Sequence, residues 1–265
     1  MDRPDRERSE GRRHFTTPRS DNKDAVFGVR AVIETIRAGK EIDRLLIQRD
    51  LGSSDTIAEL LQVAREANVV VSRVPHEKLD RITRKNHQGV IAFVSAIRYV
   101  SLHNMLSGVY EKGETPFLLI LDRITDVRNF GAIARTAECA GVHAIVIPIR
   151  GAAQINADAV KTSSGALNFI PVCREDNLKD TVIYLQQSGL QVVACTEKAE
   201  KNIYQADYTS PTAIIMGSEE DGISDELIRK ADVLAKIPMT GNIASLNVSV
   251  AAGAVVFEAV RQRLG

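Results

Sequence analysis

The run FLLILD at residues 117–122 constrains the fold of this chain more than any other feature, because five consecutive side chains in it are apolar. A strand with one face in water alternates apolar and polar residues, whereas a strand covered on both faces is apolar throughout. The run therefore predicts a central strand of a sheet that other elements cover on both faces.

Strand-like and helix-like patterns alternate from this run onward. Further strands are predicted at AIVIP, FIPVC, QVVACT, TAIIMGS and VLAKIPM, and helices at NFGAIARTAECAG, ADAVKTSSGAL, NLKDTVIYLQQSG, SDELIRKA and after residue 247. Apolar residues at three- and four-residue steps in the last helix predict one buried face, formed by Val250, Ala254, Phe257 and Val260. The alternation predicts an α/β fold with a mostly parallel sheet, in which ligands bind at the carboxyl ends of the strands.

The part of the chain before this sheet divides into three segments. Residues 1–23 are dominated by charge and have almost no apolar side chains, which predicts a disordered tail. Residues 24–97 again alternate helical and strand-like patterns, which predicts a small α/β domain. Residues 98–115 mix a short helical piece with Gly and Pro and are interpreted as a linker, so that the second domain spans 116–265.

Composition narrows the function classes. With 44% hydrophobic and 26% charged residues, the chain is typical of soluble globular proteins. Its net charge of zero gives no argument for nucleic-acid binding, although a neutral total can conceal a local basic face. The three cysteines are widely spaced and lack a CxxC pattern, which predicts reduced thiols and no metal site. Because no membrane-spanning run or secretory signal is recognisable, a cytoplasmic protein is expected.

Three polar loops follow predicted strands of the second domain. The first contains the pattern N-x-G-x-x-x-R, formed by Asn129, Gly131 and Arg135 at a strand-to-helix turn. Gly131 would allow a ligand to approach the backbone closely, and Asn129 could cap the following helix. By itself the pattern also fits an ordinary helix cap and an arginine in solvent.

The second and third loops carry different chemistry. The second, G-x-E-x-x-G, runs from Gly217 to Gly222 and holds Glu219 in an acidic turn. An acidic loop is unsuited to phosphate and better suited to a cofactor with an amino group or a positive charge. The third loop, residues 237–249, supplies glycine, amides and hydroxyls just before the last helix. Helix capping would explain Ser245 or Asn247 alone, but not all of these polar residues.

In this order, the three motifs resemble those of the SpoU/TrmH class of RNA ribose 2′-O-methyltransferases, which carry N-x-G-x-x-x-R, G-x-E-x-x-G and I-P-M-x-G-x-x-x-S-L-N-V-S. Here they occupy residues 129–135, 217–222 and 237–249. The segments FGVRAV and NHQGVIAFV resemble the substrate-binding domain of those members that methylate a guanosine of large-subunit (23S) ribosomal RNA. The resemblance covers most of the chain after residue 23.

The resemblance implies a fold, a cofactor and partners. The second domain would contain a deep trefoil knot, bind S-adenosylmethionine and pair with a second copy in a homodimer. Residues 24–97 would adopt the L30e-like fold of an RNA-binding domain. The expected reaction is 2′-O-methylation of a ribose in RNA, with a guanosine of 23S ribosomal RNA as the expected target.

The same resemblance assigns roles to individual residues. The expected catalytic residues are Asn129, Arg135, Glu219, Ser245 and Asn247. The cofactor pocket would be formed around Gly217, Ile237, Met239, Gly241 and Leu246. In the first domain, the densest basic and polar cluster is expected to contact RNA, although a solvated surface would have the same composition; it comprises Arg84, Lys85, Asn86, His87 and Gln88.

Arg135 has a specific expected role. Because a guanidinium is hardly ever deprotonated in proteins, this residue is expected to hold an RNA phosphate and stabilise the developing alkoxide as a cation. The identity of the final proton acceptor is left open.

Two other functions fit part of the sequence. A tRNA could replace ribosomal RNA as the substrate of the same reaction. A non-catalytic RNA-binding or ribosome-assembly protein would need only the first domain, so the cofactor and arginine motifs argue against it. Transfer of a labelled methyl group to ribosomal RNA would distinguish the enzyme from the binding protein.

Overall fold

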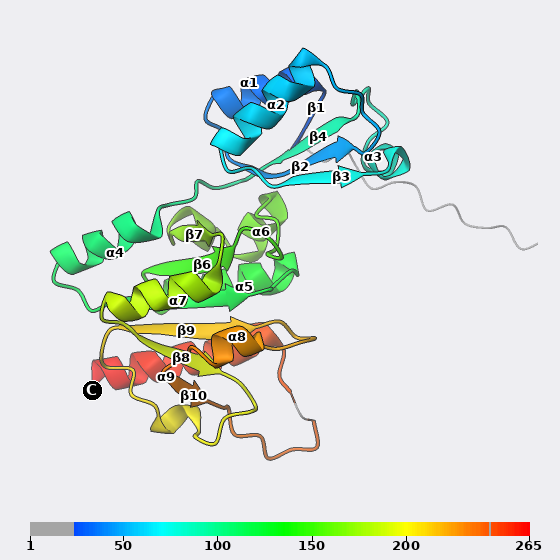
Figure 1. Cartoon of the computed structure of the whole chain (residues 1–265). Helices are drawn as coiled ribbons and strands as arrows, with labels where there is room; N and C mark the ends of the chain where they lie inside the picture. Colours follow the sequence, from blue (N-terminus) through cyan, green and yellow to red (C-terminus); the bar gives the residue numbers. More distant parts are fainter. Residues whose placement is uncertain (1–23, 244) are drawn as a thin grey trace, which may run out of the picture.

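The computed structural model describes residues 24–243 and 245–265, which form two α/β units built on separate sheets (Figure 1). The predicted disordered tail, residues 1–23, lies outside the described residues. Within the part of the chain that is described, none of the helices combines the length and the apolar composition that crossing a membrane requires.

The N-terminal unit has a four-stranded sheet in the order β1-β4-β2-β3. Its strands are β1 (Ala25–Phe27), β2 (Ile42–Gln48), β3 (Val71–Val74) and β4 (Val90–Val94). β2 and β3 are parallel, while β4 is antiparallel to both β1 and β2. The sequence patterns do not predict β1, because its three residues directly precede a strong helical pattern.

Helices cover both faces of this sheet. They are α1 (Val29–Arg37), α2 (Asp55–Glu66) and α3 (His76–Ile82). α1 and α2 share a core with Leu45 and Ile47 of β2, whereas α3 shares a second core with Leu46. Consecutive residues of β2 therefore point to opposite, equally buried faces, as expected for a sheet between two helical layers.

The C-terminal unit has a six-stranded sheet in the order β10-β8-β9-β5-β6-β7, and every pairing in it is parallel. Its strands are β5 (Phe117–Asp122), β6 (Ala144–Pro148), β7 (Val172–Glu175), β8 (Gln191–Cys195), β9 (Thr212–Gly217) and β10 (Val233–Ala235). The FLLILD run forms β5, which is buried along its whole length between β9 and β6. The predicted mostly parallel sheet is confirmed.

Helices also cover both faces of the second sheet (Figure 1). One face carries α5 (Val127–Cys139), α6 (Ala157–Thr162) and α9 (Val248–Leu264), and the other carries α4 (Leu102–Glu111), α7 (Leu178–Gln187) and α8 (Asp225–Ile228). α4 lies in the segment 98–115, for which the sequence predicts a linker. Because Leu102 and Leu106 are buried in the core of the second unit, this segment belongs to that unit rather than connecting the two.

The orientation of α9 differs from the prediction. Its buried residues are Val248, Ala252, Val255, Val256, Glu258 and Ala259. The face predicted to be buried instead points outward, since Val250 is 55% and Phe257 50% exposed. Leu264, seven residues after Phe257, is 83% exposed and continues the same stripe. The apolar residues of α9 lie on several sides of the helix, so their spacing alone does not identify the face that packs against the sheet.

The two units contact each other around Asp43 of β2. Its carboxylate accepts hydrogen bonds from the Tyr99 hydroxyl (2.5 Å) and from the Ile155 backbone N–H (3.1 Å). The guanidinium of Arg174, on β7, lies 3.7 Å from the same carboxylate and 4.5 Å from the centre of the Tyr99 ring. Burial raises the pKa of Asp43, against the opposing effects of Tyr99 and Arg174. One largely buried carboxylate thus joins the N-terminal unit to the second sheet.

Candidate active site

The three polar loops meet at the side chain of Asn247. Its Nδ2 donates hydrogen bonds to Oδ1 of Asn129 (3.0 Å) and to Oε1 of Glu219 (2.6 Å). Its Oδ1 accepts hydrogen bonds from the backbone N–H (3.0 Å) and the hydroxyl (2.5 Å) of Ser249, so Asn247 is the N-cap of α9. Both amide hydrogens and the carbonyl oxygen are therefore used within the protein, and Asn247 acts as a connector of the three loops.

Glu219 and Asn129 each keep a hydrogen-bonding group that other described residues do not use. Glu219 Oε1 also accepts from the backbone N–H of Val248 (3.3 Å). Among the described residues, neither Glu219 Oε2 nor the Asn129 amide nitrogen forms a hydrogen bond. One carboxylate oxygen and one amide donor therefore remain for a ligand.

The glycines of the G-x-E-x-x-G loop are required by a tight turn. Ser218 and Gly222 exchange two backbone hydrogen bonds of 3.2 and 3.0 Å. A Cβ atom on Gly217 would lie 2.1 Å from the carbonyl carbon of Gly222, so no other residue fits there without moving the backbone. Gly222 itself has φ +66°, a value that favours glycine. The turn presents Glu219 toward the start of α9.

A charged pair at the end of β5, which the sequence patterns do not single out, fixes this turn. Asp122 is buried and accepts a hydrogen bond of 2.7 Å from the backbone N–H of Ser224. Arg123, with φ 59°, donates to Asp122, to the Asp221 carboxylate (3.1 Å) and to the Gly222 carbonyl (3.2 Å). The only sequence signal is an aspartate at the end of an apolar strand, followed directly by an arginine.

Helix α5 differs in detail from its prediction. Its N-cap is Asp126, which accepts from the backbone N–H groups of Arg128 and Asn129, so Asn129 is not the cap. Gly131 faces α6, where a Cβ would lie 2.7 Å from Thr162 Cβ, and its role is helix packing rather than ligand approach. Arg135 is exposed and forms no hydrogen bond or ion pair within the described residues, so its expected catalytic role stays a prediction.

A cavity of about 380 Å³ lies where β8, β9 and β10 end, the edge at which parallel sheets bind ligands. Of the residues expected to bind the cofactor, Gly217, Ile237, Met239 and Leu246 line it, together with Glu219 and Ser245. Gly241 does not line the cavity and is exposed, with no atom within 4 Å of an added Cβ. Burial raises the pKa of the Cys195 thiol, also in this wall, to about 12, so that thiol is neutral.

The cavity combines apolar and acidic walls. Met216 at the end of β9, Ile237 just after β10 and Ile223 in the loop before α8 contribute apolar surface. Four carboxylates face it, and Lys236 is the single basic residue in the same lining; the carboxylates belong to Glu197, Glu219, Glu220 and Asp221. Such a wall favours a ligand with an apolar part and a positive charge.

A second hollow of about 460 Å³ shares one wall with this cavity. Ser218–Asp221 and Val248 line both, while Asn129, Gly151 and the segment from Arg123 to Asp126 line only the second. Glu219 therefore stands between the two hollows and could contact ligands in both.

The loop expected to bind RNA is only partly available. Arg84, Lys85, Asn86 and Gln88 are exposed, and the Lys85 ammonium lies 5.7 Å from the centre of the Phe27 ring. His87 is 5% exposed, and its ring bonds to Asp80 (3.1 Å) and to the backbone N–H of Gly89 (3.0 Å). His87 supports the loop from inside, and its burial gives no support to the expectation that it contacts RNA.

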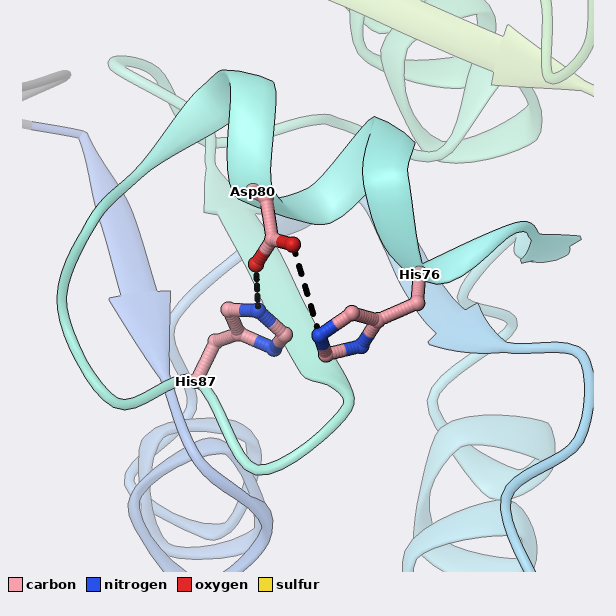
Figure 2. Close-up of side chains that lie close together, drawn as sticks. All are labelled: His76, Asp80 and His87. Atoms are coloured by element: carbon pink, nitrogen blue, oxygen red, sulfur yellow. Dashed lines mark hydrogen bonds and ion pairs between the residues drawn. The ribbon is translucent and has the colours of Figure 1, made fainter.

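Figure 2 shows that His87, Asp80 and His76 point toward one another, with ligand-type atoms within 4.8 Å. The Gly89 N–H donates to Nδ1 of His87, so the proton of the neutral ring is on Nε2, where it is donated to Asp80. A metal on Nε2 would displace that proton from a ring whose other nitrogen is already unprotonated. This hydrogen bonding favours a structural cluster over a metal site.

Comparison with known proteins identifies the family. The sequence model of the SpoU rRNA Methylase family matches residues 116–257, more than half of the chain. The chain belongs to the SpoU methylase family. A second model, "RNA 2′-O ribose methyltransferase substrate binding", matches residues 25–100 of this SpoU protein. Both units described above are thus represented among SpoU proteins.

Relatives of the SpoU chain match along most of its length. The 23S rRNA (guanosine-2′-O-)-methyltransferase RlmB of Vibrio parahaemolyticus is 38% identical and covers 90% of this chain and 97% of its own. The SpoU methyltransferase AviRb of Streptomyces viridochromogenes, solved with AdoMet, has a TM-score of 0.57 and 26% identity over 91% of this chain and 90% of its own. The A. aeolicus TrmH/SpoU tRNA modifying enzyme has a TM-score of 0.51 and 30% identity, covering 62% and 84% of the two chains.

Proposed function

We propose that this SpoU protein transfers a methyl group from S-adenosylmethionine to a ribose 2′-hydroxyl of RNA, at a guanosine of 23S ribosomal RNA. The observation that carries the proposal is the junction at Asn247, which joins three motifs 118 and 28 residues apart beside the acidic cavity. The names of the RlmB relatives support the ribosomal substrate and the guanosine.

The 380 Å³ cavity fits the proposed cofactor. When bound, S-adenosylmethionine supplies an electrophilic methyl group on a positively charged sulfur. Ile237, Met239 and Leu246 offer apolar contact to its less polar parts, and the neighbouring carboxylates favour its positive charges. The similarity to AviRb, whose structure was solved in complex with AdoMet, supports this assignment.

The second hollow is the proposed place of the reacting ribose. Asn129 and Glu219 line it, and the free amide hydrogens and carboxylate oxygen of these residues can bind and orient sugar hydroxyls. The protein has mainly to align the attacking oxygen with the methyl group, because the sulfonium is already a good leaving group. Arg135 holds an RNA phosphate as a cation, and Ser245 contacts the reacting groups from the cofactor side.

The proposed fold of residues 24–97 is the L30e-like RNA-binding fold, and that of the second unit is the deep trefoil knot. The family match to residues 25–100 supports the first. For the second, α9 shares a core with both β9 and the connection that contains η2 (Ile203–Gln205). This helix is therefore packed close to a loop through which a knotted chain would pass.

The exposed stripe of α9 supports a homodimer formed through the catalytic domain. Val250, Phe257 and Leu264 recur at seven-residue steps on one side of the helix. A second copy would cover this apolar side, which water alone covers in one chain. An enzyme that modifies ribosomal RNA in this way is proposed to act in the cytoplasm.

The test is methyl transfer from tritiated S-adenosylmethionine by the purified protein. Label is expected in 23S ribosomal RNA from cells that lack this protein, and mapping should place it on a guanosine 2′-oxygen. Label in tRNA alone would favour the second candidate function, which the similarity to the A. aeolicus tRNA modifying enzyme supports. Absence of label in either RNA would contradict the proposal.

A further inference from the structure

A cleft of about 350 Å³ lies between the two units. Its N-terminal wall is formed by Arg44 of β2 and by residues 70–72 at the start of β3. Its opposite wall is formed by Ile147–Gln154, where β6 ends, and by Arg174 of β7. The cleft therefore opens at the same edge of the second sheet as the candidate active site.

The cleft is basic. Three arginines line it, and Asp43 is the single acidic residue in the lining. The Asp43 oxygens are already used by Tyr99, Ile155 and Arg174. Arg44 and Arg150 are exposed, and neither side chain forms a hydrogen bond or ion pair with the residues that the structure describes. Two guanidinium groups from different units thus face one cleft without a hydrogen bond or ion pair to a described side chain, and Asp43 acts on Arg44 only through its charge.

The cleft adjoins the hollow that Asn129 and Glu219 line. Gly151 lines both, directly after Arg150. Another hollow at the boundary between the units has the opposite charge, since Glu41, Glu175, Asp176 and Asp180 line it with Arg174. A polyanion that extends from the active site is therefore attracted into the cleft that Arg150 and Arg44 line, and the acidic hollow repels it.

We propose that Arg150 and Arg44 bind phosphates of the RNA strand next to the nucleotide placed at Asn129 and Glu219. Guanidinium groups bind phosphate oxygens through paired hydrogen bonds, which suits both arginines to this role. Because they belong to different units, the bound strand links the units across the Asp43 contact. The inference rests on the proposed function, since it takes RNA as the ligand.

The test measures binding of a fluorescein-labelled single-stranded oligouridylate by the full chain as a function of salt. Arg44→Gln and Arg150→Gln are each expected to weaken binding about two- to fivefold. Each should also reduce the slope of log affinity against log salt by about 0.7, and the double variant by about twice that amount. Thermal unfolding should be unchanged, because both side chains are exposed.

Arg49→Gln and Arg229→Gln are the matched controls, since both arginines are exposed and lie outside the lining of the cleft. A slope unchanged in the cleft variants, or lowered equally in the controls, overturns the inference. Polyglutamate that displaces the RNA as well as unlabelled oligouridylate does would also overturn it, because the cleft would then be a general polyanion surface. RNA binding that depends on both arginines without any methyl transfer would refute the proposed enzyme and leave this inference intact.

Discussion

At the scale of single residues, the side-chain amide of Asn247 both caps α9 and connects the three polar loops. Its oxygen holds the first turn of α9, while its nitrogen holds Asn129 and Glu219 in place. Replacing it by alanine should cost about 1 kcal/mol of stability, as for other asparagine caps. Methyl transfer should fall much further, because three loops lose their common partner.

Asn177 offers a matched control for this substitution. It caps α7 on the opposite face of the sheet, where its oxygen accepts from the Lys179 N–H at 2.9 Å. Asn177→Ala should lose similar stability in urea titrations and keep full activity. If Asn247→Ala retains wild-type turnover, Asn247 is an ordinary cap.

Gly217 is the glycine on which the cofactor cavity depends. Gly217→Ala would press a methyl group against the backbone of Gly222, at 2.1 Å, and should destabilise the protein by about 1–3 kcal/mol. Calorimetry should show cofactor affinity reduced at least tenfold. Gly241→Ala, with no atom near the added group, should bind the cofactor like the wild type. Equal affinity in the two variants would contradict the assigned role of the turn.

Arg135 tests the electrostatic part of the proposed reaction. Arg135→Ala should reduce turnover by about 10²–10³, the scale for losing one preorganised donor, and leave cofactor affinity unchanged. Arg128→Ala, on the same helix and equally exposed, is the control. A collapse of cofactor binding in the Arg135 variant would instead place this residue in the cofactor site.

Sequence patterns predict individual residues well where a motif fixes both the residue type and its neighbours. The motifs predict that Asn129, Glu219 and Asn247 share one site, and the three side chains do meet. Arg123 cannot be found in this way, because its role depends on a positive φ and on partners 98 and 99 residues away. His87 lies in a loop whose basic and polar composition suggests RNA binding, but its side chain is buried against Asp80 and Gly89.

At the scale of elements, α9 carries the surface on which the proposed homodimer depends. Phe257→Asp places a charge in the middle of the exposed stripe and should convert the dimer to a folded monomer. Sedimentation velocity would measure the change. Val100→Asp adds the same charge at another apolar site, 43% exposed, and should leave the dimer intact. A wild-type protein that is monomeric at high concentration would refute the dimer.

The loop between α3 and β4 depends on the cluster in Figure 2. His87→Ala removes one of the two partners of Asp80 and the acceptor of the Gly89 N–H, and should cost about 1–3 kcal/mol of stability. Arg84→Ala, at an exposed position of the same loop, should change stability little. Zn²⁺ should not raise the melting temperature of the wild type, and a clear rise would show that the cluster binds metal.

Element types follow from the sequence more reliably than element faces. The continuous apolar run predicts β5 as a covered strand, because its length suits a strand and is short for a buried helix. α9 is apolar on several sides, so only the position of the sheet decides that Val255 faces inward and Phe257 outward. Likewise, α4 resembles a linker until Leu102 and Leu106 are seen in the core of the second unit.

At the scale of the whole molecule, 34 basic and 34 acidic residues cancel to a net charge of zero, yet the two signs gather in different places. Acidic side chains surround the cofactor cavity and one hollow between the units, while arginines line the cleft on the other side. Composition reports only the sum, so neither the basic cleft nor the contact at Asp43 could be predicted from it. Both depend on how the two units are placed against each other.

The acidic wall of the cavity has a consequence for turnover. The sulfur of the proposed cofactor is positively charged before the methyl group leaves and neutral afterwards, so Glu219, Glu220 and Asp221 attract the substrate form more than the spent form. At solvent-exposed carboxylates this preference is modest, about two- to fivefold, and salt weakens it. Calorimetry with S-adenosylmethionine and S-adenosylhomocysteine at low and high salt should show the two affinities converging. Product inhibition should therefore become stronger as the ionic strength rises.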